Sequence, residues 1–132
     1  MNVISFPRCS IAYLRRTGAY GAVNRAVMER LLALSSQAGV LGLESAILSI
    51  AWDDPAHTPP EACRYDACLV LQKGQTLPGA DVRYGSLPGG RYAVFTIPHT
   101  EQAVSEAWHT IGRLLLKTGC TADPGRPVME RY

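Results

Sequence analysis

Two amphipathic segments, each followed by a glycine, constrain the fold of this chain most. Apolar residues recur at helical spacing over residues 21–38 and again over residues 101–118. Gly39 ends the first run and Gly119 ends the second, as is typical of a helix C-terminus. A shift of 80 positions superimposes these two glycines. The pattern therefore predicts two helices in two similar halves of the chain.

Other segments around the helices carry the features of strands. They are rich in β-branched, aromatic and other apolar residues, and most are bounded by Gly, Pro or Asp. These segments are residues 11–16, 46–52, 64–71, 82–86 and 91–97. Pro88 followed by Gly89-Gly90 predicts a tight hairpin between the last two strands. A shift of 81 positions aligns Pro7 with Pro88 and Ala12 with Ala93, which supports a duplication.

The predicted fold class is α+β. It is a duplicated strand-helix-strand-strand arrangement, with an antiparallel sheet and both helices on one face. At 132 residues the chain fits one domain, residues 1–132. A net charge of +2 with scattered arginines gives no indication of a nucleic-acid partner for this domain. The apolar runs are short and the start MNVISFPR lacks a secretion signal, so we expect a cytoplasmic protein without a membrane partner.

The cysteines and other reactive residues indicate neither a metal nor a cofactor. Four cysteines are present, without C-x-x-C or Cys/His spacing, and we interpret them as buried thiols. No order of Ser, His and Asp resembles a nucleophile motif, so no catalytic residue is predicted from motifs. Arg64 and Asp66 are two apart on one predicted strand and share a face, which suggests an ion pair or polar support.

The stretch DDPAHTPPEACRYDACLVL, followed by LPGGRYAVF, resembles the GyrI-like small-molecule-binding family, which also forms the effector-binding domain of AraC-type transcription regulators. RRTGAYG resembles the family's turn into its first helix, carried here by Gly18, Tyr20 and Gly21. The resemblance runs from about residue 3 to the end. It implies an SHS2-like fold with a ligand groove between the two helices, and concave apolar sites of this kind commonly bind small molecules.

The chain departs from the family pattern in three places. IPHT, with His99, stands where many relatives have a second G-P-Y turn. GRPVMERY resembles the family's late strand, with Glu130 on its acidic position, and the usual last strand is missing after Tyr132. No helix-turn-helix segment precedes the domain, so we expect a free-standing module or part of a larger regulator. An unpaired strand edge invites pairing with another chain, so a homodimer is also expected.

The resemblance places Glu130 on the floor of the groove. An ionised carboxylate in an aromatic pocket favours a cationic ligand that supplies the missing charge. Trp108 either packs in the core or stacks on such a ligand at the groove edge. Tyr20, Trp52, Tyr92 and Tyr132 complete the predicted ligand-binding residues.

Three functions follow from the resemblance. The leading one is binding of small hydrophobic, cationic compounds as a sensor or sequestering module, alone or within a transcription regulator. The second is hydrolysis of cyclopropane-containing electrophilic toxins, with Glu130 as general base. The third is protection or inhibition of DNA gyrase by direct contact, suggested by the family's name. We expect binding rather than catalysis.

Overall fold

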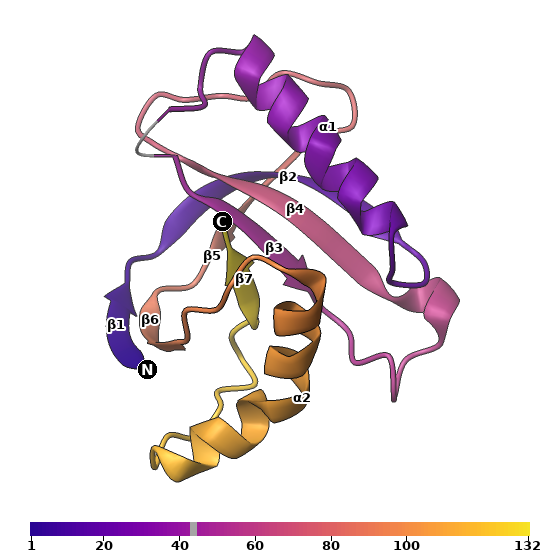
Figure 1. The fold of residues 1–132 in the computed structure, drawn as a ribbon. Helices are drawn as coiled ribbons and strands as arrows, with labels where there is room; N and C mark the ends of the chain where they lie inside the picture. The colour runs from indigo at the N-terminus through magenta and orange to yellow at the C-terminus, as the bar shows by residue number, and fades with distance from the viewer. Residues whose placement is uncertain (43–44) are drawn as a thin grey trace. The chain divides into compact units, whose positions relative to one another are not determined.

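The computed structural model describes residues 1–42 and 45–132. Contacts between Cα atoms divide the chain into two compact units. Unit 1 is formed by Met1–Arg8 and Pro88–Arg126, and unit 2 by Cys9–Leu87 and Pro127–Tyr132. Figure 1 shows the ribbon of both units. Each is described by itself below.

Unit 2 contains a five-stranded antiparallel sheet and one helix. Its strands lie in the order β5-β2-β4-β3-β7. Their bounds are Cys9–Thr17 for β2, Ile47–Ala51 for β3, Arg64–Leu71 for β4, Arg83–Leu87 for β5 and Met129–Arg131 for β7. Helix α1 spans Val23–Gln37, and a short 3₁₀ helix, η1, spans Pro60–Ala62 before β4.

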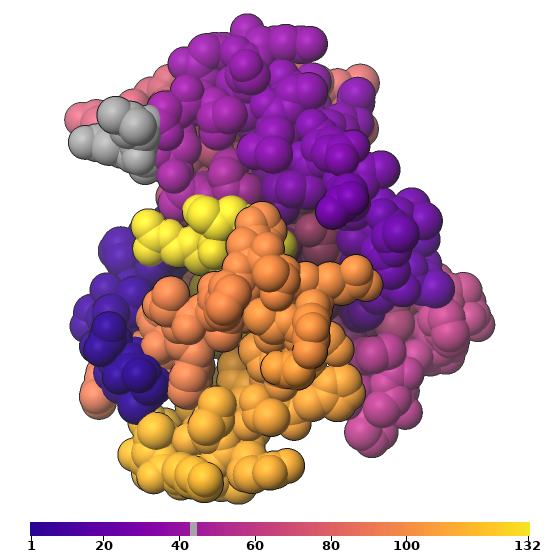
Figure 2. Space-filling model, viewed as in Figure 1, coloured from indigo at the N-terminus to yellow at the C-terminus, as the bar shows by residue number. Residues whose placement is uncertain are grey.

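Helix α1 packs against the inner strands of the sheet, and together they form the core of unit 2. It contacts β2 and β4, and it lies over them in the ribbon (Figure 1). In the space-filling view, atoms of α1 hide much of these strands (Figure 2). Leu31 of α1 is completely buried. It belongs to one apolar cluster with sheet residues that alternate along the strands, namely Ala12, Leu14, Ile47, Tyr65, Ala67 and Leu69.

Unit 1 contains one strand pair and the second helix. Strand β1 spans Asn2–Phe6 and pairs antiparallel with β6, which spans Gly90–Val94. Helix α2 spans Glu101–Lys117. Its first turn is capped by Thr100, whose side-chain hydroxyl accepts a hydrogen bond from the backbone N–H of Ala103 at 3.1 Å. Glu101 at its start and Lys117 at its end both suit the helix dipole.

The sequence-based fold class is confirmed: the chain is α+β, with two helices and antiparallel strands. Both helices lie where periodicity predicted them, and all five predicted strands exist with shifts of a few residues at their ends. Strand β1 was not predicted. Helices α1 and α2 belong to different units. Their placement on one face, the groove between them and the homodimer stay predictions.

The predicted hairpin at Gly89-Gly90 is wrong. Strand β5 pairs with β2, and β6 pairs with β1, so the two strands that flank these glycines do not pair with each other. Gly89 instead allows a close approach of two backbone segments. A Cβ at Gly89 would lie 2.6 Å from the backbone N of Arg8 and 2.9 Å from the carbonyl oxygen of Phe6. Only glycine fits there without a backbone shift.

The described residues lack two features, a membrane-spanning helix and a metal-binding cluster. No helix within residues 1–42 and 45–132 has the length and apolar character needed to cross a membrane. Within the same residues, no three His, Cys, Asp or Glu side chains are arranged to hold a metal ion. Cys63 and Cys68 are buried thiols as predicted, whereas Cys9 and Cys120 are partly exposed.

Candidate functional site

A row of side chains crosses the sheet of unit 2 on the face that carries α1. Ala67 of β4 belongs to the core cluster under the helix. In the strand register, Ser49 of β3 lies opposite Ala67, and Glu130 of β7 lies opposite Ser49. Residues opposite each other in a ladder point to the same face. The register therefore places Glu130 and Ser49 on the face of the sheet that α1 covers.

Glu130 contacts a phenol and is linked through it to Ser49. The Tyr132 hydroxyl donates to Oε2 of Glu130 at 2.8 Å. The same hydroxyl lies 3.3 Å from Oγ of Ser49. Ser49 is buried, Glu130 is half-buried and Tyr132 is 52% exposed. This cluster of Ser49, Tyr65, Glu130 and Tyr132 is called the Glu130 cluster below.

Both phenols of the Glu130 cluster stay protonated at neutral pH. Burial raises the pKa of Tyr65 to about 12, and the neighbouring acidic groups Tyr132 and Glu130 add to the rise, while a hydrogen bond with Ser49 opposes it. Burial also raises the pKa of Tyr132, and its hydrogen bond to Glu130 adds to the effect. The cluster thus presents hydroxyl donors beside one carboxylate.

The opening stretch of the long connection, Trp52-Asp53-Asp54-Pro55, is tied to the start of β4. Asp53 forms a two-point contact with Arg64, with Nε to Oδ2 and a terminal nitrogen to Oδ1 both at 3.0 Å. These hydrogen bonds to Arg64 lower the pKa of Asp53. The Tyr20 hydroxyl donates to the Arg64 carbonyl at 2.7 Å and accepts from the Asp53 N–H at 3.1 Å. Tyr20 therefore anchors the connection.

Trp52 lies with a buried acid on the other face of the sheet. Its Nε1 donates to Oδ2 of Asp66 at 2.6 Å. Asp66 alternates with the core residues Tyr65 and Ala67 along β4, so it points away from α1. Arg15 contacts both oxygens of Asp66 at 2.8 Å. Asp66 thus pairs with Arg15 and Arg64 pairs with Asp53, rather than Arg64 with Asp66 as the sequence suggested.

The other two predicted ligand-binding aromatics lie in unit 1. Trp108 is on α2 and is 41% exposed. Tyr92 of β6 packs edge-on against Phe6 with ring centroids 5.8 Å apart. The guanidinium of Arg126 lies 5.0 Å from the centre of the Tyr92 ring. Of the six predicted residues, the structure therefore brings Glu130 and Tyr132 into direct contact.

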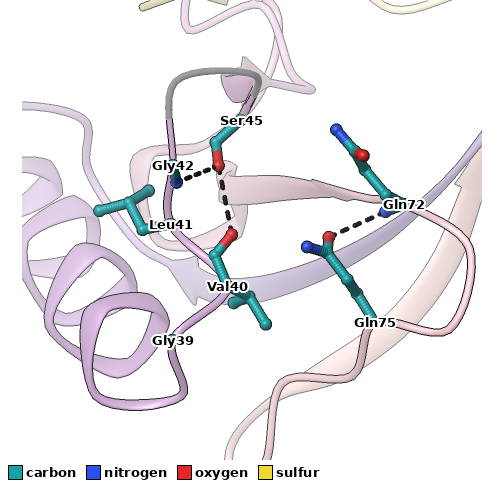
Figure 3. A pocket seen from close by; sticks show the side chains of 7 residues that line it. All are labelled: Gly39, Val40, Leu41, Gly42, Ser45, Gln72 and Gln75. Atoms are coloured by element: carbon teal, nitrogen blue, oxygen red, sulfur yellow. Dashed lines mark hydrogen bonds between the residues drawn. The ribbon is translucent and has the colours of Figure 1, made fainter.

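A separate hollow of about 330 Å³ lies elsewhere in unit 2, between the segment after α1 and the turn after β4. Figure 3 shows its lining, where Ser45 bonds to Gly42 and Val40 and where Gln75 accepts from the Gln72 N–H. Among the lining residues that the structure describes, none has a charged or aromatic side chain. It offers little to orient a ligand, so we take the Glu130 cluster as the candidate site.

Sequence reasoning missed Ser49 and Tyr65. Both lie on strands that were predicted correctly. Because side chains alternate along a strand, each residue points to the same face of the sheet as the core residues of its own strand. The missing information was the register between β3 and β7, which brings Glu130 opposite Ser49. Chemically, the cluster can hold a cation against a carboxylate, offer hydroxyl donors to a polar group, or orient a water molecule.

Comparisons with known proteins agree with this fold. The family model described as "GyrI-like small molecule binding domain" matches residues 1–132. A protein of Bacillus subtilis (strain 168), named "SPbeta prophage-derived putative transcriptional regulator YosT", is 42% identical over 134 residues, which cover 100% of this chain and 87% of that protein. "Probable transcriptional regulator YgiV" of Escherichia coli (strain K12) is 32% identical over 120 residues, which cover 82% of this chain and 72% of that protein.

A more distant relative and a solved structure complete the comparison. A "DNA gyrase inhibitor" of Edwardsiella ictaluri (strain 93-146) is 27% identical over 136 residues, covering 100% of this chain and 85% of that protein. The crystal structure of the EcmrR C-terminal domain matches 98% of this chain and 92% of its own, with a TM-score of 0.58 and 10% identity, which is a likeness of fold. The full-length family match and the close relatives together show that the chain belongs to the GyrI-like small molecule binding domain family.

Proposed function

We propose that this protein binds small hydrophobic cations, as a sensor or sequestering module, with Glu130 as the charge partner. Membership of a small-molecule-binding family supports binding of a ligand. The cationic character of the ligand is argued from the Glu130 cluster. Relatives named as transcriptional regulators support a sensor within a regulatory system.

One observation carries the proposal. Glu130 is a half-buried carboxylate beside two phenols, and the Tyr132 hydroxyl donates to it at 2.8 Å. A partly desolvated carboxylate gains more from a cation than an exposed one does, because the interaction is screened less. Aromatic rings beside it add favourable contacts to a flat or cationic ligand.

The proposal is tested with two ligands of one shape. The probes are 2-naphthyltrimethylammonium and its neutral carbon analogue, 2-tert-butylnaphthalene, with binding measured by quenching of tryptophan fluorescence and by thermal shift. We expect the cation to bind more tightly. Glu130→Gln should weaken cation binding about 10- to 100-fold, between the worth of an ion pair in water and that of one near a protein surface, and should leave the neutral analogue unaffected.

The matched control is Glu61→Gln, which makes the same change at an exposed carboxylate of η1 in the same unit. It should bind both probes as the unmodified protein does. Equal affinity of the Glu130→Gln protein and the unmodified protein for the cation would refute the charge-partner role.

A second candidate function rests on the same pair of residues. The contact of the Tyr132 hydroxyl with Glu130 at 2.8 Å is an arrangement that can orient a water molecule for general-base attack. Under this hypothesis the protein hydrolyses strained cyclopropane-containing electrophiles. Direct contact with gyrase draws on the names of relatives such as the Edwardsiella protein alone. No residue cluster in the described parts of the chain adds to it.

A further inference from the structure

We propose that Ser49 is a positioning residue of the Glu130 cluster, which orders the Tyr132 hydroxyl against Glu130 and thereby sets the preference of the site for a cation over a neutral ligand of the same shape. This inference rests on the proposed function, because it assumes that Glu130 faces the ligand. It assigns a role to a buried hydroxyl of the cluster that does not itself carry charge.

The chemistry of the groups fixes the direction of the hydrogen bonds. An ionised carboxylate only accepts, so the single hydroxyl proton of Tyr132 is used in the bond to Glu130. The contact between Ser49 and Tyr132 at 3.3 Å must then use the proton of Ser49 and the oxygen of Tyr132. The donors therefore run from Ser49 through Tyr132 to Glu130.

Burial makes Ser49 the fixed point of this chain of hydroxyls. Ser49 is 5% exposed and lies in the middle of its row, between Ala67 and Glu130. Tyr132, by contrast, is 52% exposed, so packing restrains its ring less. The backbone N–H of Tyr132 bonds to the Ile47 carbonyl at 3.0 Å, which holds the residue beside β3 but leaves the ring to be oriented by side-chain contacts. The Ser49 hydroxyl supplies one such contact from a rigid strand.

The orientation of Tyr132 matters for charge selection. Hydrogen bonds in a chain polarise one another, so a donor that itself accepts a bond donates more strongly to the carboxylate. A well-held donor keeps the Glu130 carboxylate in one rotamer. The affinity for a neutral ligand does not depend on the orientation of the carboxylate, whereas the affinity for a cation does. Loss of the Ser49 hydroxyl should therefore change the ratio of the two affinities rather than both affinities together.

The experiment measures this ratio with 2-naphthyltrimethylammonium and 2-tert-butylnaphthalene on the full chain. Ser49→Ala should lower the ratio about fivefold, the worth of one ordinary hydrogen bond, because the affinity for the cation falls more than the affinity for the neutral probe. Ser49→Thr keeps the hydroxyl and should keep the ratio. Tyr132→Phe removes the same link from an exposed residue and should lower the ratio as well, which gives a second variant if burial makes Ser49→Ala unstable.

A double variant separates this inference from the proposed function. In a Glu130→Gln background, Ser49→Ala should have no further effect on the ratio, because Ser49 acts through the carboxylate. If Glu130→Gln lowers the ratio but Ser49→Ala and Tyr132→Phe leave it unchanged, the role of Ser49 is overturned and the proposed function stands. If Glu130→Gln itself leaves the ratio unchanged, the proposed function fails first.

Discussion

The indole nitrogen of Trp52 lies 2.6 Å from Oδ2 of Asp66, a carboxylate that is only 1% exposed. Arg15 binds both oxygens of the same carboxylate at 2.8 Å. The ion pair between Arg15 and Asp66 joins β2 to β4. The Trp52 indole, directly after β3, joins the end of that strand to both. A buried charge with these partners costs little, but the loss of its cation leaves the carboxylate uncompensated.

Arg15→Ala should therefore destabilise the protein strongly. Removal of one partner of a buried ion pair costs about 3–5 kcal/mol, because the other charge stays buried without its partner. Urea unfolding followed by circular dichroism measures the change. The matched control is Arg30→Ala, which removes an equally bidentate contact to Asp81 with both side chains about half exposed. Its unfolding midpoint should hardly move. Similar losses in both variants would contradict the argument from burial.

Two glycines of unit 1 should respond in opposite directions to alanine. A Cβ at Gly89 would lie within 3.0 Å of the backbone of β1 and of Arg8, so Gly89→Ala should cost about 1–3 kcal/mol as strands shift. Gly112 lies inside α2 with nothing within 4 Å of the added carbon. Gly112→Ala should stabilise by about 0.5–1 kcal/mol, because alanine favours a helix. Thermal unfolding of the two variants checks both signs.

Stability above neutral pH should depend on Tyr65. Burial raises the pKa of Tyr65 to about 12 in the folded protein, against about 10 in an unfolded chain. The unfolded chain therefore loses this proton first, and the free energy of unfolding falls as pH rises from about 10 to about 12. Below about pH 10 the contribution is fully present. The Tyr65→Phe protein should lose less stability over this window in urea unfolding, and equal losses would contradict the assignment.

Incubation with a cyclopropane-bearing electrophile separates binding from hydrolysis. General acid/base help is worth roughly 10²–10⁴-fold in rate, so turnover would be visible by mass spectrometry of the ring-opened product. We expect the compound to be bound and returned unchanged. Product that accumulates over many turnovers, and that disappears in the Glu130→Gln protein, would favour the hydrolase instead.

Local sequence patterns were sufficient to predict most of the helices and strands of this fold. The first helix was predicted over residues 21–38 and spans Val23–Gln37, because its apolar spacing and Gly39, with a φ of +70°, are local signals. Strand β4 was predicted with its observed bounds, Arg64–Leu71. Strand β1 was missed, since five residues that are exposed or half-buried give no clear alternation.

Pairing between distant segments was the part that local patterns did not contain. Pro88-Gly89-Gly90 resembles a turn, but its flanking strands find partners near the start of the chain, β1 and β2. The same limit applied to the site. Glu130 was identified by resemblance and Tyr132 as an aromatic residue of a strand, whereas Ser49 joins them only through the register of β3 with β7. Hydrophobic pattern fixes which face a residue takes, not which distant residue lies opposite.

The pairing of β3 with β7 also has a consequence for the protein as it is being made. Ser49 and Tyr132 are 83 positions apart, so at about 5–20 residues per second the ribosome takes on the order of 4–17 s to pass from one to the other. During that interval α1, β2, β3 and β4 are available to fold, but the outer edge of β3 has no β7 beside it. The unpaired backbone groups of an open strand edge can pair with other nascent chains. Synthesis of β7 closes that edge and delivers Glu130 in the same event, so a newborn chain gains the proposed ligand site and its protection from aggregation together.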